Sequence, residues 1–181
     1  MNIVDKKYKI SILVFLLLFA VSTFQIKVQG QSKYPDTKKG VKQMALDLKK
    51  ASIEDIKKLM PTMDDCKAIM KAEMDARKLY NYVEKMSSAL VKMTESPIKA
   101  RKGQTAVLVK KVTIGGANML NEQYEFPGGY KKIFKKMKKG ITLYEFKYVE
   151  PEMDYGRRYD GLMFINNKWV FVPKMWRAFR K

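Results

Sequence analysis

The sequence predicts an α+β fold, with N-terminal helices, one of them long, packed on a curved antiparallel β-sheet that ends in a C-terminal hairpin. Apolar residues recur at helical spacing over residues 36–95, and the pattern changes to the alternation of strands over residues 104–173. The strands follow the helices without the βαβ alternation of a parallel sheet. With 181 residues, 46% of them hydrophobic, the chain can bury one core, so we expect residues 31–181 to form a single domain.

Residues 1–30 have the composition of a secretory signal peptide. Three lysines within residues 6–9 precede an apolar stretch over residues 10–19, and small residues follow it. Cleavage after Ser22 and cleavage after Gly30 both fit this pattern. The alternative is an uncleaved signal anchor, but the apolar segment of about 15 residues is shorter than the roughly 20 that span a bilayer. We therefore expect export to the periplasm or the extracellular space.

Three helix-start signals divide the N-terminal half of the mature chain. Asp36 fits the N-cap of a short amphipathic helix that ends near Leu48. Ser52 and Thr62 are each followed three residues later by an aspartate, the pattern of a capping box. The first box opens a second short helix. The second opens an apolar period that runs to Met93, so we expect a single helix of about 30 residues there.

The C-terminal half has the pattern of strands. Residues 105–114 and 141–149 are β-rich and alternate between apolar and polar side chains. Residues 151–158 have the composition of a polar loop. A hairpin is expected from Tyr159 onward, because the Asn-Asn pair at 166–167 tolerates the left-handed conformation that a two-residue turn demands.

Two segments lie between the first two strands. Residues 123–126 fit a short strand, and residues 130–139 fit a basic amphipathic helix with apolar residues on one face. Such a helix can lie on an anionic membrane or cell-envelope surface, with about 1 kcal/mol from each lysine near the surface. Alternatively, its apolar residues are the core face of a short helix between strands. The lysines concerned are Lys131, Lys132, Lys135, Lys136, Lys138 and Lys139.

The net charge favours anionic partners. It is +19 for the chain, and about +16 for residues 31–181, because residues 1–30 contain four lysines and one aspartate. A solvated lysine coat explains the same excess. In the tail, Lys174–Lys181, aromatic and basic side chains alternate, which suits either a binding surface or a segment folded back over the core. Export argues against nucleic acid as the partner.

An aromatic set on the strands is the predicted ligand-binding surface. These strands carry apolar residues on both faces, so one face can be more exposed than a core requires. The alternative is a second layer of core, covered by helices or by another subunit. We expect a non-enzymatic binding module for a small ligand or a protein partner, with a homodimer among the options. The set comprises Tyr144, Phe146, Tyr148, Trp169 and Phe171.

The order of elements, with Asn166-Asn167-Lys168-Trp169 in the last hairpin, resembles the nuclear-transport-factor-like (SnoaL-like, cystatin-related) α+β roll of small exported bacterial proteins. The resemblance covers residues 36–175. It implies a cone-shaped sheet with a pocket between sheet and helices, used for small ligands, catalysis or protein pairing. Enzymes of that superfamily place acidic or histidine bases in the cone, and this chain has no histidine.

Besides attachment of a cationic protein to an anionic membrane or cell-envelope surface, catalysis is the second alternative function. Cys66 is the only cysteine, and without a histidine nothing activates it as a nucleophile. In an apolar pocket, the pKa of Glu145 or Asp160 would be raised, and the carboxyl group could act as the acid or base of a hydrolase or isomerase. Alternatively, each carboxylate forms an ion pair with a lysine. The acidic residues 150–154 lack the ligand spacing of a calcium loop. No zinc, phosphate-loop or dinucleotide signature occurs, so no metal or cofactor is expected.

Overall fold

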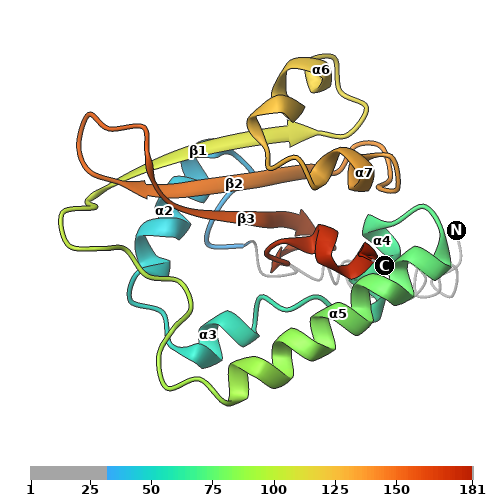
Figure 1. Ribbon diagram of the computed structural model, residues 1–181, viewed down its shortest axis with the longest axis horizontal. Helices are drawn as coiled ribbons and strands as arrows, with labels where there is room; N and C mark the ends of the chain where they lie inside the picture. The colour runs from blue at the N-terminus through green and yellow to red at the C-terminus, as the bar shows by residue number, and fades with distance from the viewer. Residues whose placement is uncertain (1–31, 181) are drawn as a thin grey trace, which may run out of the picture. The chain divides into compact units, whose positions relative to one another are not determined.

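Four antiparallel strands form the centre of the structure, a computed structural model that describes residues 32–180. They are β1 (Ala106–Thr113), β2 (Thr142–Val149), β3 (Gly156–Ile165) and β4 (Lys168–Phe171), paired in the order β1-β2-β3-β4 (Figure 1). Helices precede this sheet in the chain, which confirms the predicted α+β class. The signal peptide predicted over residues 1–30 lies outside the described residues.

The C-terminal hairpin forms at the predicted turn. Asn166 and Asn167 have φ angles of 51° and 62°, and Ile165 pairs with Lys168 across them. Left-handed backbone at both central positions is the type I′ geometry, whose twist matches that of the flanking strands. The Asn166 side chain also donates a hydrogen bond of 2.8 Å to Asp65, which ties the turn to a helix start.

A bulge at Gly161 divides β3. Glu145 of β2 pairs with Asp160, and the preceding Tyr144 pairs with Leu162, so Gly161 has no partner on β2. Its φ of +91° is in the region that favours glycine, and a Cβ there would lie 2.0 Å from the carbonyl oxygen of Val172. β4 pairs with β3 only beyond this bulge, over Leu162–Ile165.

The N-terminal helices begin where the capping signals are. The helices are α2 (Lys38–Leu48), α3 (Ile53–Lys57) and α4 (Met63–Ile69). Both predicted capping boxes form, with Asp55 and Asp65 closing them. The N-cap of α2 is Thr37, whose hydroxyl accepts a hydrogen bond from the Gly40 amide, and not Asp36 as expected.

The long helix predicted from residue 63 is interrupted. α4 ends at Ile69, Met70 is extended, and α5 (Glu73–Val91) begins after it. The break allows backbone pairing with a distant segment: the Lys71 amide donates to the Lys136 carbonyl, and the Lys138 amide donates to Ile69, both at 2.9 Å. The expectation of one continuous helix was wrong because this pairing is not local.

The same pairing shortens the basic helix predicted over residues 130–139. Only α7 (Tyr130–Phe134) is helical, and the chain then turns so that Met137 bridges to Met70. The strand expected over residues 123–126 is also wrong. That segment forms the 3-10 helix η1 (Gln123–Glu125), directly after α6 (Met119–Glu122).

Both faces of the sheet are covered. On one face α2 packs against an aromatic cluster that includes Tyr144 and Phe146. On the other face, α4, α7 and most of α5 pack against residues such as Leu143 and Met163, together with the C-terminal 3-10 helix η2 (Met175–Phe179). α5 runs along the β3 side of the sheet (Figure 1), and its Leu90 joins the first cluster. Among residues 32–180, no helix combines the length and apolar character needed to span a bilayer.

Candidate functional site

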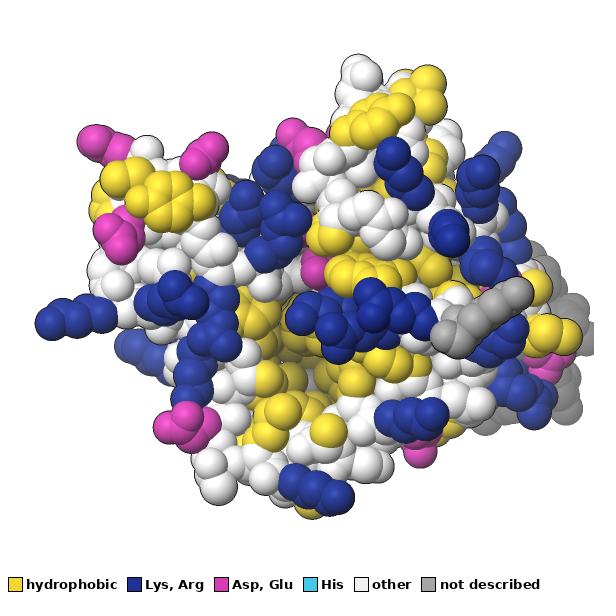
Figure 2. All heavy atoms as spheres, viewed as in Figure 1, with side chains coloured by type: hydrophobic (Ala, Val, Ile, Leu, Met, Phe, Trp, Pro, Cys, Tyr) yellow, Lys and Arg dark blue, Asp and Glu magenta, His cyan; other side chains and the backbone are white. Residues whose placement is uncertain are grey.

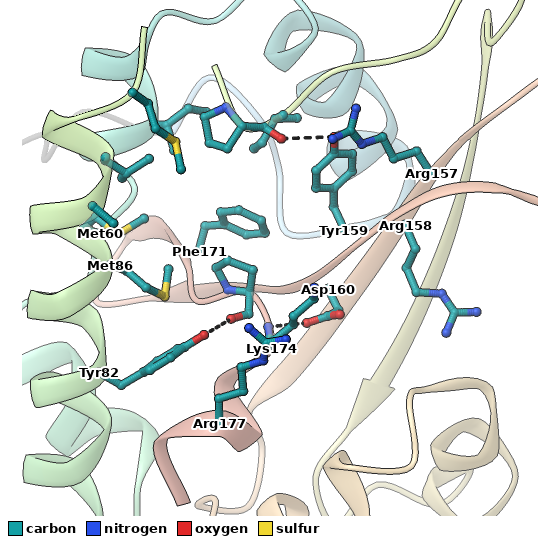
Figure 3. Close-up of a pocket in the computed structure, with 17 residues that line it drawn as sticks. Met60, Tyr82, Met86, Arg157, Arg158, Tyr159, Asp160, Phe171, Lys174 and Arg177 are labelled. Atoms are coloured by element: carbon teal, nitrogen blue, oxygen red, sulfur yellow. Dashed lines mark hydrogen bonds between the residues drawn. The ribbon is translucent and has the colours of Figure 1, made fainter. Parts of the chain in front are cut away.

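A cavity of about 370 Å³ lies between the sheet and the helices α3 and α5 (Figure 3). One wall is the N-terminal half of β3, residues 157–160. This half has β2 on one side, but β4 does not reach it, since β4 pairs only with Leu162–Ile165. The bulge at Gly161 and the short β4 therefore leave the space that the cavity occupies.

The interior of the cavity is apolar. Ile56, Leu90 and Phe171 are buried core residues that line it, whereas Met60, which follows α3, and Met86 of α5 are half-buried in the lining. Methionine side chains are flexible and polarisable, so they adapt to an apolar body of varied shape. The lining suits a hydrocarbon or aromatic group.

Two tyrosines hold the walls of the cavity together. The Tyr82 hydroxyl, on α5, donates a hydrogen bond of 3.0 Å to the carbonyl of Pro173 (Figure 3). The Tyr159 hydroxyl, on β3, accepts a hydrogen bond of 2.7 Å from the Lys99 amide and lies 3.2 Å from the Pro97 carbonyl. These bonds tie α5 and the loop after it to the β3 and β4 side of the cavity, and so fix the positions of its walls.

Basic side chains surround the cavity. Arg157 and Arg158 come from β3, and Lys174 and Arg177 from the segment after β4, and all four are exposed. Within residues 32–180, only Arg158 of these four pairs with a carboxylate. The cations therefore give the mouth of an apolar cavity a positive potential.

Among residues 32–180, Asp160 is the one carboxylate that lines the cavity, and its Oδ1 already accepts two hydrogen bonds. Its Oδ1 accepts from the Tyr130 hydroxyl at 2.8 Å and from the Lys174 amide at 2.7 Å. Burial raises the pKa of Asp160, while these two hydrogen bonds act in the opposite direction. Lys174 has a φ of 54°, so Asp160 stabilises a left-handed residue at the turn into η2. This arrangement indicates a structural role.

Glu145 lies outside the cavity lining, opposite Asp160 on β2. Its side chain is 1% exposed, and the Arg158 Nε is 3.1 Å from its Oε1. The geometry of that contact is not that of a hydrogen bond, and neither carboxylate oxygen has a hydrogen-bond partner among residues 32–180. Burial raises the pKa of Glu145 to about 7, and the nearby Arg158 charge only partly offsets it. The sequence analysis expected either an acid or base role for Glu145 or an ion pair with a lysine. The charged partner of Glu145 is instead an arginine, Arg158.

The predicted aromatic surface is inside the core. All five of its residues are buried, so the exposed face expected from their alternation is absent. The Tyr148 hydroxyl donates to the Ala45 carbonyl at 2.5 Å, and the Trp169 indole donates to Tyr34 at 2.9 Å. Tyr144, Phe146, Tyr148 and Trp169 pack under α2 as the second layer of core that was the alternative. Phe171 alone of the five lines the cavity.

The basic residues at the cavity were missed by sequence reasoning. Residues 151–158 have a loop-like composition, yet β3 begins at Gly156 and carries both arginines into the sheet. The adjacent arginines Arg157 and Arg158, just before an apolar run, were the sequence signal that could have indicated a basic site at the start of this strand. Lys174 and Arg177 were noted only as part of the tail, because nothing local shows that the tail meets β3.

The basic segment and the tail meet on another side of the domain. Tyr130 of α7 contacts Trp176 of η2 with ring centroids 4.8 Å apart, so the tail folds back on the core. Gly129 permits this contact, because a Cβ there would lie 2.6 Å from the indole. Of the six predicted lysines, Lys136 is bound to Asp75 at 2.8 Å, and the others are exposed.

The remaining candidates for chemistry are simple to place. Cys66 is buried in the core, and burial raises the pKa of its thiol to about 12. Such a thiol is not a nucleophile near neutral pH. Over the described stretch, 32–180, no three histidine, cysteine, aspartate or glutamate side chains gather in a way that would hold a metal ion.

Comparison with known proteins gives no relative from which a function for this site could be inferred. No family model, no curated protein and no solved structure matches this chain. The resemblance to the nuclear-transport-factor-like roll therefore stays a prediction.

Proposed function

We propose that the protein is a non-enzymatic binding module, and that its ligand is a small amphiphile with an apolar body and one anionic group. The observation that carries this proposal is the combination of an apolar cavity with four basic side chains around it: Arg157, Arg158, Lys174 and Arg177. The apolar body would occupy the space between Met60, Met86 and Phe171. The anionic group would lie at the mouth, where three of the cations have no carboxylate partner among the described residues.

The size and lining of the cavity support this ligand class. Its volume of about 370 Å³ is within the roughly 300–1,000 Å³ of typical small-molecule sites. Apolar burial supplies about 25 cal/mol for each Å² removed from water. Exposed cations add less, about 1 kcal/mol each at contact distance, but they select anionic over neutral ligands. Asp160 already accepts two hydrogen bonds, which favours binding over acid or base chemistry.

Titration calorimetry with dodecanoate and dodecanol, below their aggregation concentrations, tests the proposal. We expect dodecanoate to bind the full chain at one site and more tightly than dodecanol. Replacing Arg157 and Arg177 by glutamine should weaken dodecanoate binding about 25-fold, at about 1 kcal/mol for each arginine, and leave dodecanol nearly unchanged. The matched control is Arg77→Gln with Arg101→Gln, which removes the same charge from exposed positions away from the cavity.

A second pair of variants tests the location. Ala89 is an exposed residue of α5 that lines the cavity, and Ser88 is its exposed neighbour that does not. Ala89→Phe should block dodecanoate, whereas Ser88→Phe should bind it like the wild type. Equal affinity for dodecanoate and dodecanol would refute the anionic part of the proposal. Equal binding by both phenylalanine variants would refute the cavity as the site.

A further inference from the structure

Two large apolar side chains protrude from α6 and η1, away from the cavity. Leu120 is 73% exposed and Tyr124 is 70% exposed. They are four residues apart on consecutive helical turns, so they share one side of this segment. On the opposite side of the segment, Met119 packs partly against the core and the Glu122 carboxylate accepts a hydrogen bond from the Thr113 amide of β1. We call Leu120 and Tyr124 the apolar tip.

A row of lysines lies next to the apolar tip. Lys131, Lys132 and Lys135, here called the lysine row, border a shallow hollow together with Tyr124. The Lys131 Nζ is 5.3 Å from the centroid of the Tyr124 ring. No carboxylate of residues 32–180 pairs with the lysine row. Figure 2 shows apolar side chains over α6 with basic side chains close by.

The core fixes the orientation of this lysine row. Tyr130, Ile133 and Phe134 are buried, so the apolar face of α7 packs against the sheet and cannot enter a membrane. The neighbouring acids do not offset the lysine charge directly: Glu125 is 3.6 Å from Lys110, and Glu122 accepts from the Thr113 amide. The apolar contribution to any docking must therefore come from the tip.

We propose that the apolar tip and the lysine row together dock the protein on an anionic lipid bilayer. Tyrosine suits the interfacial zone, where its ring is apolar and its hydroxyl remains in water. Leucine adds an apolar side chain that can enter the boundary between headgroups and acyl chains. Lysine ammonium groups pair with anionic headgroups while their stems cover apolar surface. A soluble polyanion would use the lysines but offers no apolar phase for Leu120 and Tyr124, so the geometry favours a bilayer.

Charge distinguishes the apolar tip from another exposed apolar site that also contains a tyrosine. Tyr155 is 69% exposed and Met153 is 43% exposed, on the loop between β2 and β3. That loop also carries Glu150, Glu152 and Asp154. An anionic surface repels it, so Tyr155 is a matched control for Tyr124.

Vesicle sedimentation tests the proposal. The full chain is mixed with vesicles of phosphatidylcholine alone, or with about a third phosphatidylglycerol, at low ionic strength. Lys131, Lys132 and Lys135 changed together to glutamine should weaken partitioning onto the anionic vesicles about 100-fold, at about fivefold for each lysine. The control changes three exposed lysines of α2, Lys38, Lys39 and Lys42, and should weaken it far less.

The apolar tip is tested by its own pair of variants. Leu120→Ala with Tyr124→Ala should weaken anionic vesicle binding about tenfold, and Tyr155→Ala should leave it unchanged. All these positions are exposed, so unchanged circular dichroism confirms that the variants fold. If the α2 and α7 lysine variants lose binding equally, the attraction is only net charge and the proposal is overturned. If the Leu120 and Tyr124 variant binds like the wild type while soluble heparin competes fully, the surface is a polyanion site and the bilayer is refuted.

Discussion

The buried carboxylate Glu145 makes the stability of the protein depend on pH in a way that one substitution should remove. Burial raises its pKa from 4.5 to about 7, so the folded state holds the proton more tightly than the unfolded state. The stability from the neutral carboxyl is fully present below the unfolded pKa and is lost as pH rises through the folded one. Glu145→Gln is neutral throughout, so this loss should disappear.

The magnitude follows from the two pKa values. An interval from 4.5 to about 7, at about 1.4 kcal/mol per pH unit, corresponds to about 3 kcal/mol. Urea unfolding should therefore show Glu145→Gln close to the wild type at about pH 4.5 and more stable by about 3 kcal/mol at about pH 8. For a domain of this size that difference is about 6–12 °C in melting temperature. The Arg158 side chain is exposed, so losing its contact with Glu145 costs less stability than the substitution gains at high pH.

A matched control and a clear contrary result exist for this experiment. Glu125→Gln makes the same chemical change on an exposed side chain and should follow the wild type at every pH. Asp160 is present in all three proteins, so its own titration largely cancels in the differences. Parallel profiles for wild type and Glu145→Gln would mean that Arg158 keeps Glu145 ionised in the fold. The interpretation of Glu145 as a buried neutral acid would then be wrong.

The bulge and the hydroxyl contact to α2 give two further predictions, both checked by urea unfolding. Gly161→Ala should destabilise the protein by about 3 kcal/mol or more, because the new Cβ would meet the Val172 carbonyl at 2.0 Å. A Cβ on Gly128 would have no atom of residues 32–180 within 4 Å, so Gly128→Ala should cost less than about 1 kcal/mol, and equal losses would refute the bulge argument. Tyr148→Phe should cost about 1 kcal/mol through loss of the hydrogen bond to Ala45, and an unchanged stability would contradict that contact.

The parts of the fold that the sequence predicts correctly are those set by interactions between residues close together in the chain. The Asn166-Asn167 turn and the capping boxes at Ser52 and Thr62 depend on residues within a few positions of one another, and each forms as expected. The interruption at Met70 depends on a strand-like pairing with Met137, far along the chain. Helical periodicity continues across Met70, so the sequence alone gives no sign of the break.

The site was harder to predict than the fold for the same reason. Alternation assigns side chains to the two faces of a strand, and it placed Tyr144 and Tyr148 together correctly. It cannot show that α2 covers that face. The cavity instead depends on where β4 stops pairing with β3 and on where Arg177 lies after the turn, and both are set by tertiary contacts.

Methyl NMR of the full chain with labelled methionine tests the central claim, ligand binding in the cavity, most directly. Met60, Met86 and Met93 line the cavity, whereas Met74 and Met153 are exposed elsewhere. Titration with dodecanoate should shift the first three methyl signals with one common binding curve and leave the other two in place. Unmoved signals at all three cavity methionines, or equal shifts at Met74 and Met153, would contradict the account.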